Sequence, residues 1–389
     1  MLRTLVSWSG SLNCRDHQFS RTQAPARFRQ RGATLVVALV VVLLVVMLAT
    51  RISGDYLVLF RTIENQNSLQ QARAYLRGAE SVAREALLQD LQLGAEIDSV
   101  QDLWSRRIQI PLPEGNMDAC IVDLQGRLNL NDLGATDAEG YNPAQKRFIR
   151  LLQVLNMETT PDQQTAVELA NAVFDWIDED DAARYPGGAE ELDYLQMQPP
   201  YRPANQAFAS TTELLLIEGM TNELVAALTP YVSVWGNGNM NLNTLDGSIT
   251  GSDRPEAFRD ADSDSGLSET PQPMLLRTLN NAESLLPLSA EGANLLASIR
   301  SGNGGWIQNL DVFNSGVLNA QVWELEGLDV KSEYFLLTAD MLVQARHYQL
   351  QSVLQREVSA TGEPIVSVRS RQIGTAVFNM DETCAAALH

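Results

Sequence analysis

The longest apolar run of the chain lies near its amino end and is followed by a helical pattern. Residues 33–50 read ATLVVALVVVLLVVMLAT, in which two threonines are the only polar residues. This length suits a helix that crosses a bilayer. Beyond it, apolar side chains recur at helical spacing, and no proline interrupts them before Pro111. The pattern predicts one helix over residues 33–92, about 90 Å long at 1.5 Å per residue. Two helices broken near Ser53 and Gly54 are the alternative.

Alternation of apolar and polar residues, which is typical of half-buried strands, marks two separate regions of the remaining chain. It occurs in residues 118–133, where Gln125 and Gly126 predict a turn between two short strands. It returns late in three runs, EYFLLTADMLVQA, RHYQLQSVLQREVS and PIVSVRSRQIG. We therefore predict one sheet from residues of about 115–132 and 332–375, packed on the long helix.

The chain between these strand regions reads as helical. Pro143 opens the run AQKRFIRLLQVLNM, and Asp162 precedes QQTAVELANAVFDWID, so both positions resemble helix starts. Gly219 separates two short helical segments, and a looser copy of this pair follows in residues 288–315. Such pairs resemble helix-hairpin-helix or SAM-like modules. Residues 246–273 are rich in Asp, Ser, Gly and Pro, and they predict a mobile linker or surface loop.

The charge balance is strongly acidic, with 28 Lys and Arg against 48 Asp and Glu and a formal net charge of −20 at pH 7. Such a surface repels phosphate backbones and attracts divalent cations, which argues against a nucleic-acid partner. The hairpin in residues 217–223 supplies acids and no basic side chain, so we expect it to serve packing or protein contact. Three histidines, His17, His347 and His389, offer little material for a histidine-based catalytic site.

The three cysteines, Cys14, Cys120 and Cys384, match no zinc-ligand spacing and are too few for a disulfide scaffold. If the amino end is removed, Cys120 and Cys384 remain. These two cysteines are candidates for a disulfide in an oxidising compartment, although the sequence does not set their geometry.

The flanks of the apolar run predict its orientation. Three arginines precede it, and Arg51 and Asp55 follow it, so the basic side stays in the cytoplasm and the rest crosses the membrane. An uncleaved signal anchor is the simplest interpretation. However, Gly32 sits between the basic leader and the apolar stretch, with no charged residue between them. This junction resembles the prepilin leader, which implies cleavage between Gly32 and Ala33 by the membrane-embedded prepilin peptidase.

The first mature residues also resemble a particular kind of pilin-like protein. Pilin-like proteins usually carry Phe at the first mature position and Glu at the fifth, whereas this chain has Ala33 and Val37. In the family, the glutamate meets the free amino terminus of a neighbouring subunit, a pairing that suits a low-dielectric membrane. The missing carboxylate and the large acidic exterior resemble the K-type minor pseudopilin of the type II secretion system, which is placed at the tip. The resemblance runs from about residue 32 to residue 374.

The resemblance implies an α+β fold. We expect a pilin-like head, formed by the long N-terminal helix and an antiparallel sheet, with a large, mainly α-helical inserted domain that contains the SAM-like or helix-hairpin-helix units. The implied parts are a prepilin leader (1–32), a transmembrane helix (33–54), a periplasmic helix with the first strands of the head (55–134), the inserted domain (135–330), the last strands of the head (331–376) and a tail (377–389).

The densest acidic cluster of the sequence lies within the predicted insertion. Residues 175–181 read DWIDEDD, and further acids follow a Pro-Gly-Gly turn at residues 186–188. Hard carboxylate oxygens on a loop that can curl are the ligands that Ca²⁺ prefers. The spacing is not that of an EF-hand, and a solvated acidic loop is the alternative by spacing alone.

The family resemblance favours calcium. K-type pseudopilins share a W-I-D-x-D-x motif followed by a G-G-A-E run and bind calcium there, and residues 176–181 and 187–193 are similar to both motifs. The resemblance implies Ca²⁺ ligands among Asp178, Asp180, Glu190 and Asp193, with Asp181 and Glu191 as substitutes.

The resemblance implies an assembly protein rather than an enzyme. We expect a minor pseudopilin, anchored once in the inner membrane with a periplasmic C-terminal domain, that caps the pseudopilus tip and helps to initiate its assembly for export of folded proteins. The implied partners are the I- and J-type minor pseudopilins in a ternary tip, and contacts with the secretin and with exported proteins are hypotheses from this position.

Two other functions stay open on the sequence. One is a membrane-anchored extracytoplasmic hydrolase with a catalytic metal in the acidic loop, although the sequence holds no HExxH motif or Ser-His-Asp arrangement. The other is a minor pilin of a type IV pilus or competence system, from which the large helical insertion would distinguish a K-type protein.

Overall fold

The computed structural model describes most of the chain downstream of the predicted leader. The described residues are 33–93, 96–113, 115–134, 140–245, 273–302, 304–316, 318, 322–343, 346–359 and 362–375. The predicted leader, almost all of the predicted linker at 246–273 and the predicted tail lie outside them. The chain divides into two compact units, residues 1–65 and 66–389.

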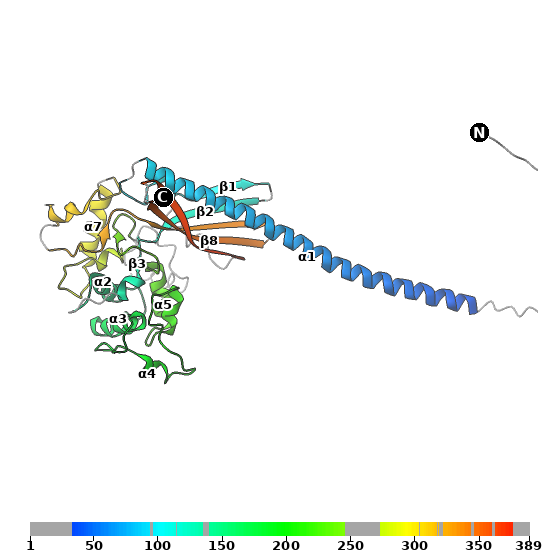
Figure 1. The fold of residues 1–389 in the computed structure, drawn as a ribbon, viewed down its shortest axis with the longest axis horizontal. Helices are drawn as coiled ribbons and strands as arrows, with labels where there is room; N and C mark the ends of the chain where they lie inside the picture. The colour runs from blue at the N-terminus through cyan, green and yellow to red at the C-terminus, as the bar shows by residue number, and fades with distance from the viewer. Residues whose placement is uncertain are drawn as a thin grey trace, which may run out of the picture. The chain divides into compact units, whose positions relative to one another are not determined.

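Helix α1 (Ala33–Gln92) begins and ends at the predicted residues (Figure 1). It is helical through Ser53 and Gly54, so the alternative of a break at this point is wrong. Within the first unit, the side chains of residues 33–62 are exposed. Among the described residues, α1 is the one helix long and apolar enough to cross a membrane, and it fits a single-pass anchor.

The part of α1 in the second unit buries one face. Its buried residues are spaced three or four positions apart, which places them on one side of a helix. They are Ser68, Ala72, Leu76, Ala79, Glu80, Ala83 and Leu87. This face packs in one hydrophobic cluster with Trp104 and the inward residues of a sheet, among them Phe335 and Leu350.

The sheet has five antiparallel strands in the order β1-β2-β7-β8-β9. Its strands are β1 (Ile108–Leu112), β2 (Gly115–Asp123), β7 (Tyr334–Val343), β8 (Arg346–Val358) and β9 (Pro364–Thr375). The three late strands confirm the predicted runs. Strand β1 was not predicted, because it is short and includes a proline, which argues against a strand.

The predicted turn at Gln125 and Gly126 is confirmed, but the two strands that flank it do not pair with each other. After β2 the chain leaves the sheet, and the Gln125 side-chain oxygen accepts hydrogen bonds from the backbone of Glu333 and Tyr334. The next strand, β3 (Leu128–Asn129), pairs in parallel with β4 (Val232–Ser233) instead of returning along β2. Contacts with residues far along the chain therefore decide the pairing of β3.

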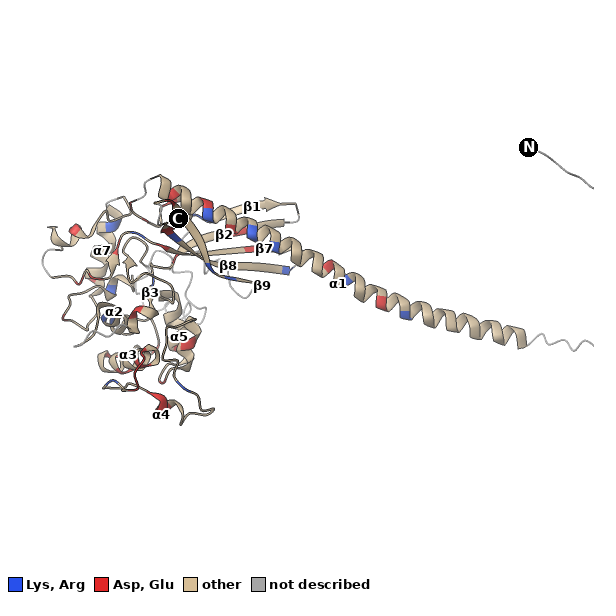
Figure 2. Ribbon diagram, in the orientation of Figure 1, with Lys and Arg blue, Asp and Glu red and all other residues tan. Residues whose placement is uncertain are grey.

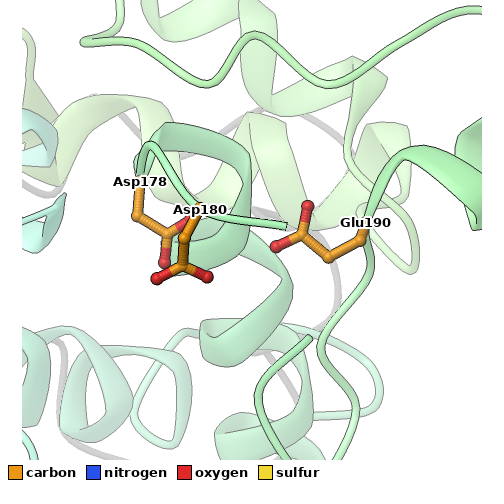
Figure 3. A group of neighbouring side chains, drawn as sticks. All are labelled: Asp178, Asp180 and Glu190. Carbon is orange, nitrogen blue, oxygen red and sulfur yellow. The ribbon is translucent and has the colours of Figure 1, made fainter. Parts of the chain in front are cut away.

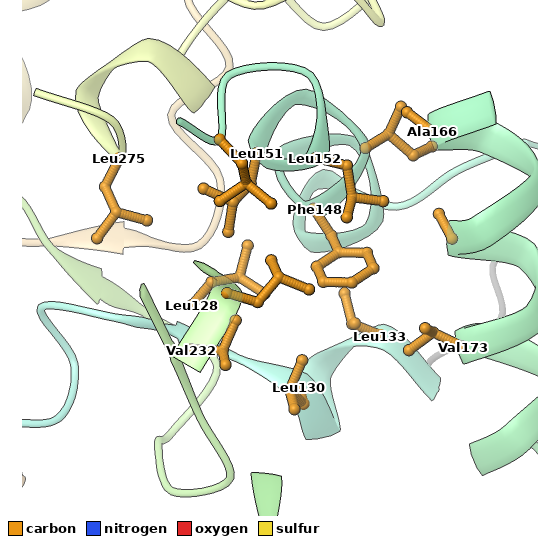
Figure 4. Close-up of a cluster of buried hydrophobic side chains, with 14 of the residues drawn as sticks. Leu128, Leu130, Leu133, Phe148, Leu151, Leu152, Ala166, Val173, Val232 and Leu275 are labelled. Carbon is orange, nitrogen blue, oxygen red and sulfur yellow. The ribbon is translucent and has the colours of Figure 1, made fainter. Parts of the chain in front are cut away.

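The chain between β2 and β7 forms a second hydrophobic cluster, of which Figure 4 shows part. Its α-helices are α2 (Pro143–Leu152), α3 (Gln163–Ile177), α4 (Glu191–Tyr194), α5 (Asn222–Leu228) and α7 (Ala290–Gly302). Its 3₁₀ helices are η2 (Leu130–Gly134), η3 (Thr211–Leu216), η4 (Thr229–Tyr231), η6 (Leu276–Thr278) and η7 (Leu310–Asn314), and a parallel pair joins β5 (Met240–Asn241) to β6 (Leu328–Asp329). A further 3₁₀ turn, η1 (Leu103–Ser105), precedes β1.

Side-chain caps explain where two of these helices start. Asn142 and Gln145 form a capping box ahead of α2, with Pro143 at the first turn. The Asp162 carboxylate accepts the backbone N–H of Thr165 at 2.8 Å and caps α3. Both predicted starts are confirmed. The pair around Gly219 consists of a 3₁₀ helix and a short α-helix, and its SAM-like character stays a prediction.

Candidate metal centre

The acidic loop joins the end of α3 to the start of α4. Asp175 lies in the last turn of α3 and Asp178 caps its C-terminal end, where the partial negative charge of the helix disfavours carboxylates. No basic residue occupies that last turn. The two carboxylates at the C-terminal end of α3 therefore require positive charge from outside the helix.

Asp175 fixes the loop from inside. Its side chain is fully buried, and its Oδ2 accepts the backbone N–H of Arg184 at 3.0 Å. A Cβ atom on Gly188 would lie 2.2 Å from the same oxygen and 2.5 Å from the Arg184 carbonyl oxygen, so this close approach requires glycine. Burial raises the pKa of Asp175 to about 6, against the opposing hydrogen bond from Arg184. The loop thus curls around a carboxylate that the sequence did not single out.

The curled loop brings three carboxylates together. Asp178, Asp180 and Glu190 each offer an oxygen, and these oxygens lie within 4.8 Å of one another (Figure 3). Asp178 and Glu190 are buried, whereas Asp180 is exposed. Within the described part of the chain, both side-chain oxygens of Glu190 and the Oδ1 atom of Asp178 lack a hydrogen-bond partner. Buried unpartnered carboxylates are costly, so this arrangement is suited to a cation.

The electrostatics of the cluster agree with its geometry. Burial, together with the charges of Asp175, Asp178, Asp181 and Asp180, raises the pKa of Glu190 to about 7. Burial and the neighbouring Asp180 also raise the pKa of Asp178. Near neutral pH, the cluster therefore either holds a proton or needs a positive ion. A buried acidic cluster of this kind can bind a metal ion.

One guanidinium lies beside the cluster but does not neutralise it. The Arg184 Nε atom is 3.6 Å from Asp175 Oδ1 and 3.8 Å from Asp178 Oδ2, distances beyond a good hydrogen bond. Next to the cluster, a cavity of about 460 Å³ is lined by Asp178, Asp180, Asn131 and Ala207, among others. This cavity gives room for water molecules that would complete the coordination of a cation.

The structure gives the other predicted ligands different tasks. Asp193 Oδ2 accepts the backbone N–H of Glu190 at 3.0 Å, so Asp193 positions Glu190 rather than joining the three oxygens. Glu191 forms an ion pair with Arg202 at 3.2 Å. Asp181 is exposed and acts on Glu190 through its charge.

Asp175 is the residue that the sequence analysis missed as a member of this centre. Its signal was present, since it lies three residues before Asp178 and therefore on the same face of α3. The W-I-D-x-D-x motif begins at Trp176 and so does not include Asp175. An acidic residue one turn before the acidic residue that ends a helix is the sequence pattern that would have identified Asp175.

The remaining predicted sites fall largely outside the described residues. Gly32 lies outside them, and Ala33 is the first residue of α1. Cys120 is buried on β2 and disulfide-bonded. Cys384 lies outside the described residues, so its pairing with Cys120 stays a prediction.

Comparisons with known proteins agree on one family. The sequence model of "Type II secretion system (T2SS), protein K" matches residues 126–237. The chain is 31% identical over 232 residues to the type II secretion system protein K of Aeromonas hydrophila, covering 57% of this chain and 69% of that protein. It is 33% identical over 230 residues to the protein K of Pectobacterium carotovorum subsp. carotovorum, covering 56% and 68%.

The fold has a solved counterpart as well. A chain in the crystal structure of the GspK-GspI-GspJ complex from the enterotoxigenic Escherichia coli type 2 secretion system is similar, with a TM-score of 0.62 and 25% identity. The similarity covers 80% of this chain and 99% of that chain.

Proposed function

The chain belongs to the type II secretion system protein K family and is thus a minor pseudopilin, and we propose that it caps the pseudopilus tip and helps to start its assembly. The similarity to a chain of the GspK-GspI-GspJ complex carries this proposal and supports I- and J-type minor pseudopilins as its partners. The assembled pseudopilus would serve the export of folded proteins across the outer membrane. Family membership favours this role over that of a type IV pilin.

The amino end of α1 supports a terminal position. Between Ala33 and Thr50 the helix carries no charged side chain, and Val37 stands where related pilins have the pairing glutamate. A neighbour stacked above would therefore meet no buried carboxylate to pair with its free amino terminus. A subunit without this contact suits the end of a filament better than its shaft.

The size of the helical region supports the same position. It has its own hydrophobic cluster, separate from the cluster between α1 and the sheet. Two cores support the division into a pilin-like head, residues 55–134 and 331–376, and an inserted domain, residues 135–330. A subunit that carries a second core is bulky for regular stacking.

The anchor is proposed to be in the inner membrane. The arginine-rich leader would stay in the cytoplasm, prepilin peptidase would cut between Gly32 and Ala33, and the second unit would lie in the periplasm. Contacts of the tip with the secretin and with exported proteins are part of the proposal.

Calcium is the proposed ion of the acidic centre. Asp178, Asp180 and Glu190 would hold it, because their oxygens converge, those of Glu190 have no donor within the described residues, and hard carboxylate oxygens suit Ca²⁺. Asp175 and Asp193 would position the loop and Glu190 through backbone N–H groups. Bound calcium would neutralise the cluster and link the end of α3 to the start of α4.

Co-purification tests the proposed role. The full-length protein is co-expressed with the I- and J-type minor pseudopilins and extracted in detergent, and we expect one equimolar complex. Immunogold labelling of pseudopili should mark one end only. Labelling at repeated positions along the shaft would contradict the tip assignment.

Processing is tested separately. Gly32→Val should retain the leader, as measured by intact mass, and should block assembly. The matched control, Gly10→Val within the leader, should be processed normally. Normal trimming of the Gly32 variant would contradict the prepilin interpretation.

A further inference from the structure

The five-stranded sheet is buried on both of its faces. Along β2, β7 and β8, alternate residues point toward α1 and belong to the hydrophobic cluster that α1 shares with the sheet. Residues between them point the other way, and several of these are buried as well. They are Cys120, Val122, Thr338, Gln349 and Val353. We call the side of the sheet that carries these five residues the outer face.

The outer face is covered by something other than the two hydrophobic clusters. Cys120 is 2% exposed, Thr338 1% and Val353 7%. Neither cluster of the described residues includes Cys120, Val122 or Val353. An antiparallel sheet that packs one face on a helix commonly leaves the other face to solvent. The burial of both faces therefore indicates that a further segment of the chain lies on the outer face.

The bonding state of Cys120 indicates which segment this is. Cys120 is disulfide-bonded, and the other two cysteines of the chain, Cys14 and Cys384, both lie outside the described residues. Cys14 belongs to the leader that the proposed cleavage after Gly32 removes, so this step rests on the proposed function. In the mature chain, Cys384 is then the one cysteine that can pair with Cys120.

The chain that follows β9 is long enough to reach Cys120. Cys120 and Gln372 of β9 lie in one row of cross-strand neighbours, which runs through Thr338 and Gln351. The row crosses three strand spacings, or about 14 Å. Strand β9 ends at Thr375, about 10 Å beyond this row. The direct distance from Thr375 to Cys120 is therefore about 18 Å, whereas residues 376–384 span about 30 Å when extended.

The composition of this segment suits the outer face. Residues 376–389 read AVFNMDETCAAALH, a mostly apolar run without Lys or Arg. Figure 2 shows β7 and β8 as mostly uncharged, and the row through Cys120 holds no charged side chain. Apolar side chains laid on Val122 and Val353 leave water, which favours the contact.

We propose that residues 376–389 bind across the outer face and that a disulfide between Cys120 and Cys384 holds them there. Formation of the bond removes two electrons and two protons from the two thiols, and an oxidised protein disulfide of the periplasm accepts them by thiol–disulfide exchange. The segment is therefore fixed in place only after the second unit has left the reducing cytoplasm. It acts as a clasp that closes in the compartment where the pseudopilus assembles.

Disulfide mapping of the intact protein tests the covalent link. The full-length protein is purified from membranes in detergent, with free thiols alkylated at lysis, and is digested without reduction for mass spectrometry. We expect one Cys120–Cys384 peptide pair that disappears on reduction. Alkylated Cys120, or a bond from Cys120 to another protein, would overturn the clasp.

The same map separates the clasp from the proposed processing. A Cys14–Cys120 pair in a chain whose intact mass includes the leader would overturn both. A Cys120–Cys384 pair in a chain that keeps its leader would support the clasp and contradict the processing alone.

Thiol accessibility tests what covers the outer face. Thr338 and Ala339 are buried neighbours on β7 that point to opposite faces, because Ala339 belongs to the cluster with α1. Thr338→Cys and its matched control Ala339→Cys are made in full-length protein whose native cysteines are replaced by Ala, with residues 376–389 present or absent. Removal of the segment should speed maleimide labelling of Thr338→Cys at least about tenfold and leave Ala339→Cys unchanged.

Unchanged protection of Thr338→Cys would assign the outer face to another segment and overturn the proposal. Faster labelling at both positions would mean that the shortened chain unfolds, and the disulfide map of the intact protein then decides.

Discussion

Two buried carboxylates in the second unit have opposite surroundings. Asp123, at the end of β2, accepts hydrogen bonds from the backbone N–H of Gln125 and from the side chains of Asn241, Thr244 and Ser332. Glu190, at the start of α4, has no hydrogen-bond donor for either oxygen within the described residues. Burial raises the pKa of both groups, to about 6 for Asp123 and about 7 for Glu190.

The difference shows two ways to keep an acid inside a protein. Around Asp123 the fold supplies the donors itself, and they come from β2, the helical region and the segment before β7. The result is a fixed junction between the sheet and the inserted region. Around Glu190 the nearest charged groups are other acids, so this cluster could bind a metal ion.

The largest expected effect lies at the fixed junction. Arg356 is buried and pairs with Asp90 at 2.8 Å and with Asp98. Arg356→Leu leaves buried carboxylates unpaired and should lower the free energy of unfolding by about 3–5 kcal/mol, measured by urea denaturation of a fragment that comprises the second unit, residues 66–389. Arg369→Leu is the matched control, because its ion pair with Glu357 is largely exposed and worth under about 1 kcal/mol. Equal losses of unfolding free energy in the two variants would contradict the difference between the buried and the exposed ion pair.

The next effect separates the acidic centre from the junction. Calcium at a hundredfold excess over its dissociation constant should stabilise the wild-type fragment by about 2.7 kcal/mol, seen as a rise in Tm that EDTA reverses. Asp178→Asn should abolish most of this rise, and the exposed control Glu283→Gln should retain it. A wild-type Tm that does not respond to calcium would remove the metal proposal and leave the filament role intact.

The pH dependence of stability tests the surroundings of Asp123, with a smaller expected effect. The folded pKa of Asp123, about 6, exceeds its ordinary value of 3.8, so the folded state binds the proton more tightly. This group's contribution to stability therefore falls as pH rises from about 4 to 6 and is constant above that range. In EDTA, wild type should lose about 1–2 kcal/mol more than Asp123→Asn over this range, measured by thermal unfolding. A parallel pH profile for the two proteins would contradict the assignment.

The smallest effect concerns the acids at the edge of the centre. Asp181→Asn and Glu191→Gln should weaken calcium binding by less than about threefold, because Asp181 acts only through its charge and Glu191 pairs with Arg202. Isothermal titration with calcium measures this directly. A loss as large as that of Asp178→Asn would make either residue a ligand.

The sequence was sufficient for elements whose signals are local. Helix α1 kept its predicted limits because its period and the lack of proline act over neighbouring residues. The starts of α2 and α3 followed from Pro143 and Asp162. The late strands followed from their alternation.

The sequence failed where distant contacts decide. The turn at Gln125 was predicted, but the pairing of β3 with β4 and the binding of the Gln125 side chain to the backbone of Glu333 were not, because no local pattern reveals them. The acidic motif located three acids that the structure brings together, Asp178, Asp180 and Glu190, but not the tasks of their neighbours. Asp193 accepts the backbone N–H of Glu190, and Asp175 binds the loop from inside, and both roles depend on how the loop closes.

Strands β2 and β7 are direct antiparallel neighbours, with Asp123 opposite Phe335 at the point where the chain leaves the sheet. The backbone N–H of Leu124 also donates to the Tyr334 carbonyl oxygen at 2.9 Å, so the two ends of the excursion meet. The whole helical region thus stands where an ordinary hairpin would need only a few residues. An insertion at this point can change in length or sequence without changing the register of β2 and β7. The pilin-like sheet and the inserted helical region are therefore free to evolve at different rates.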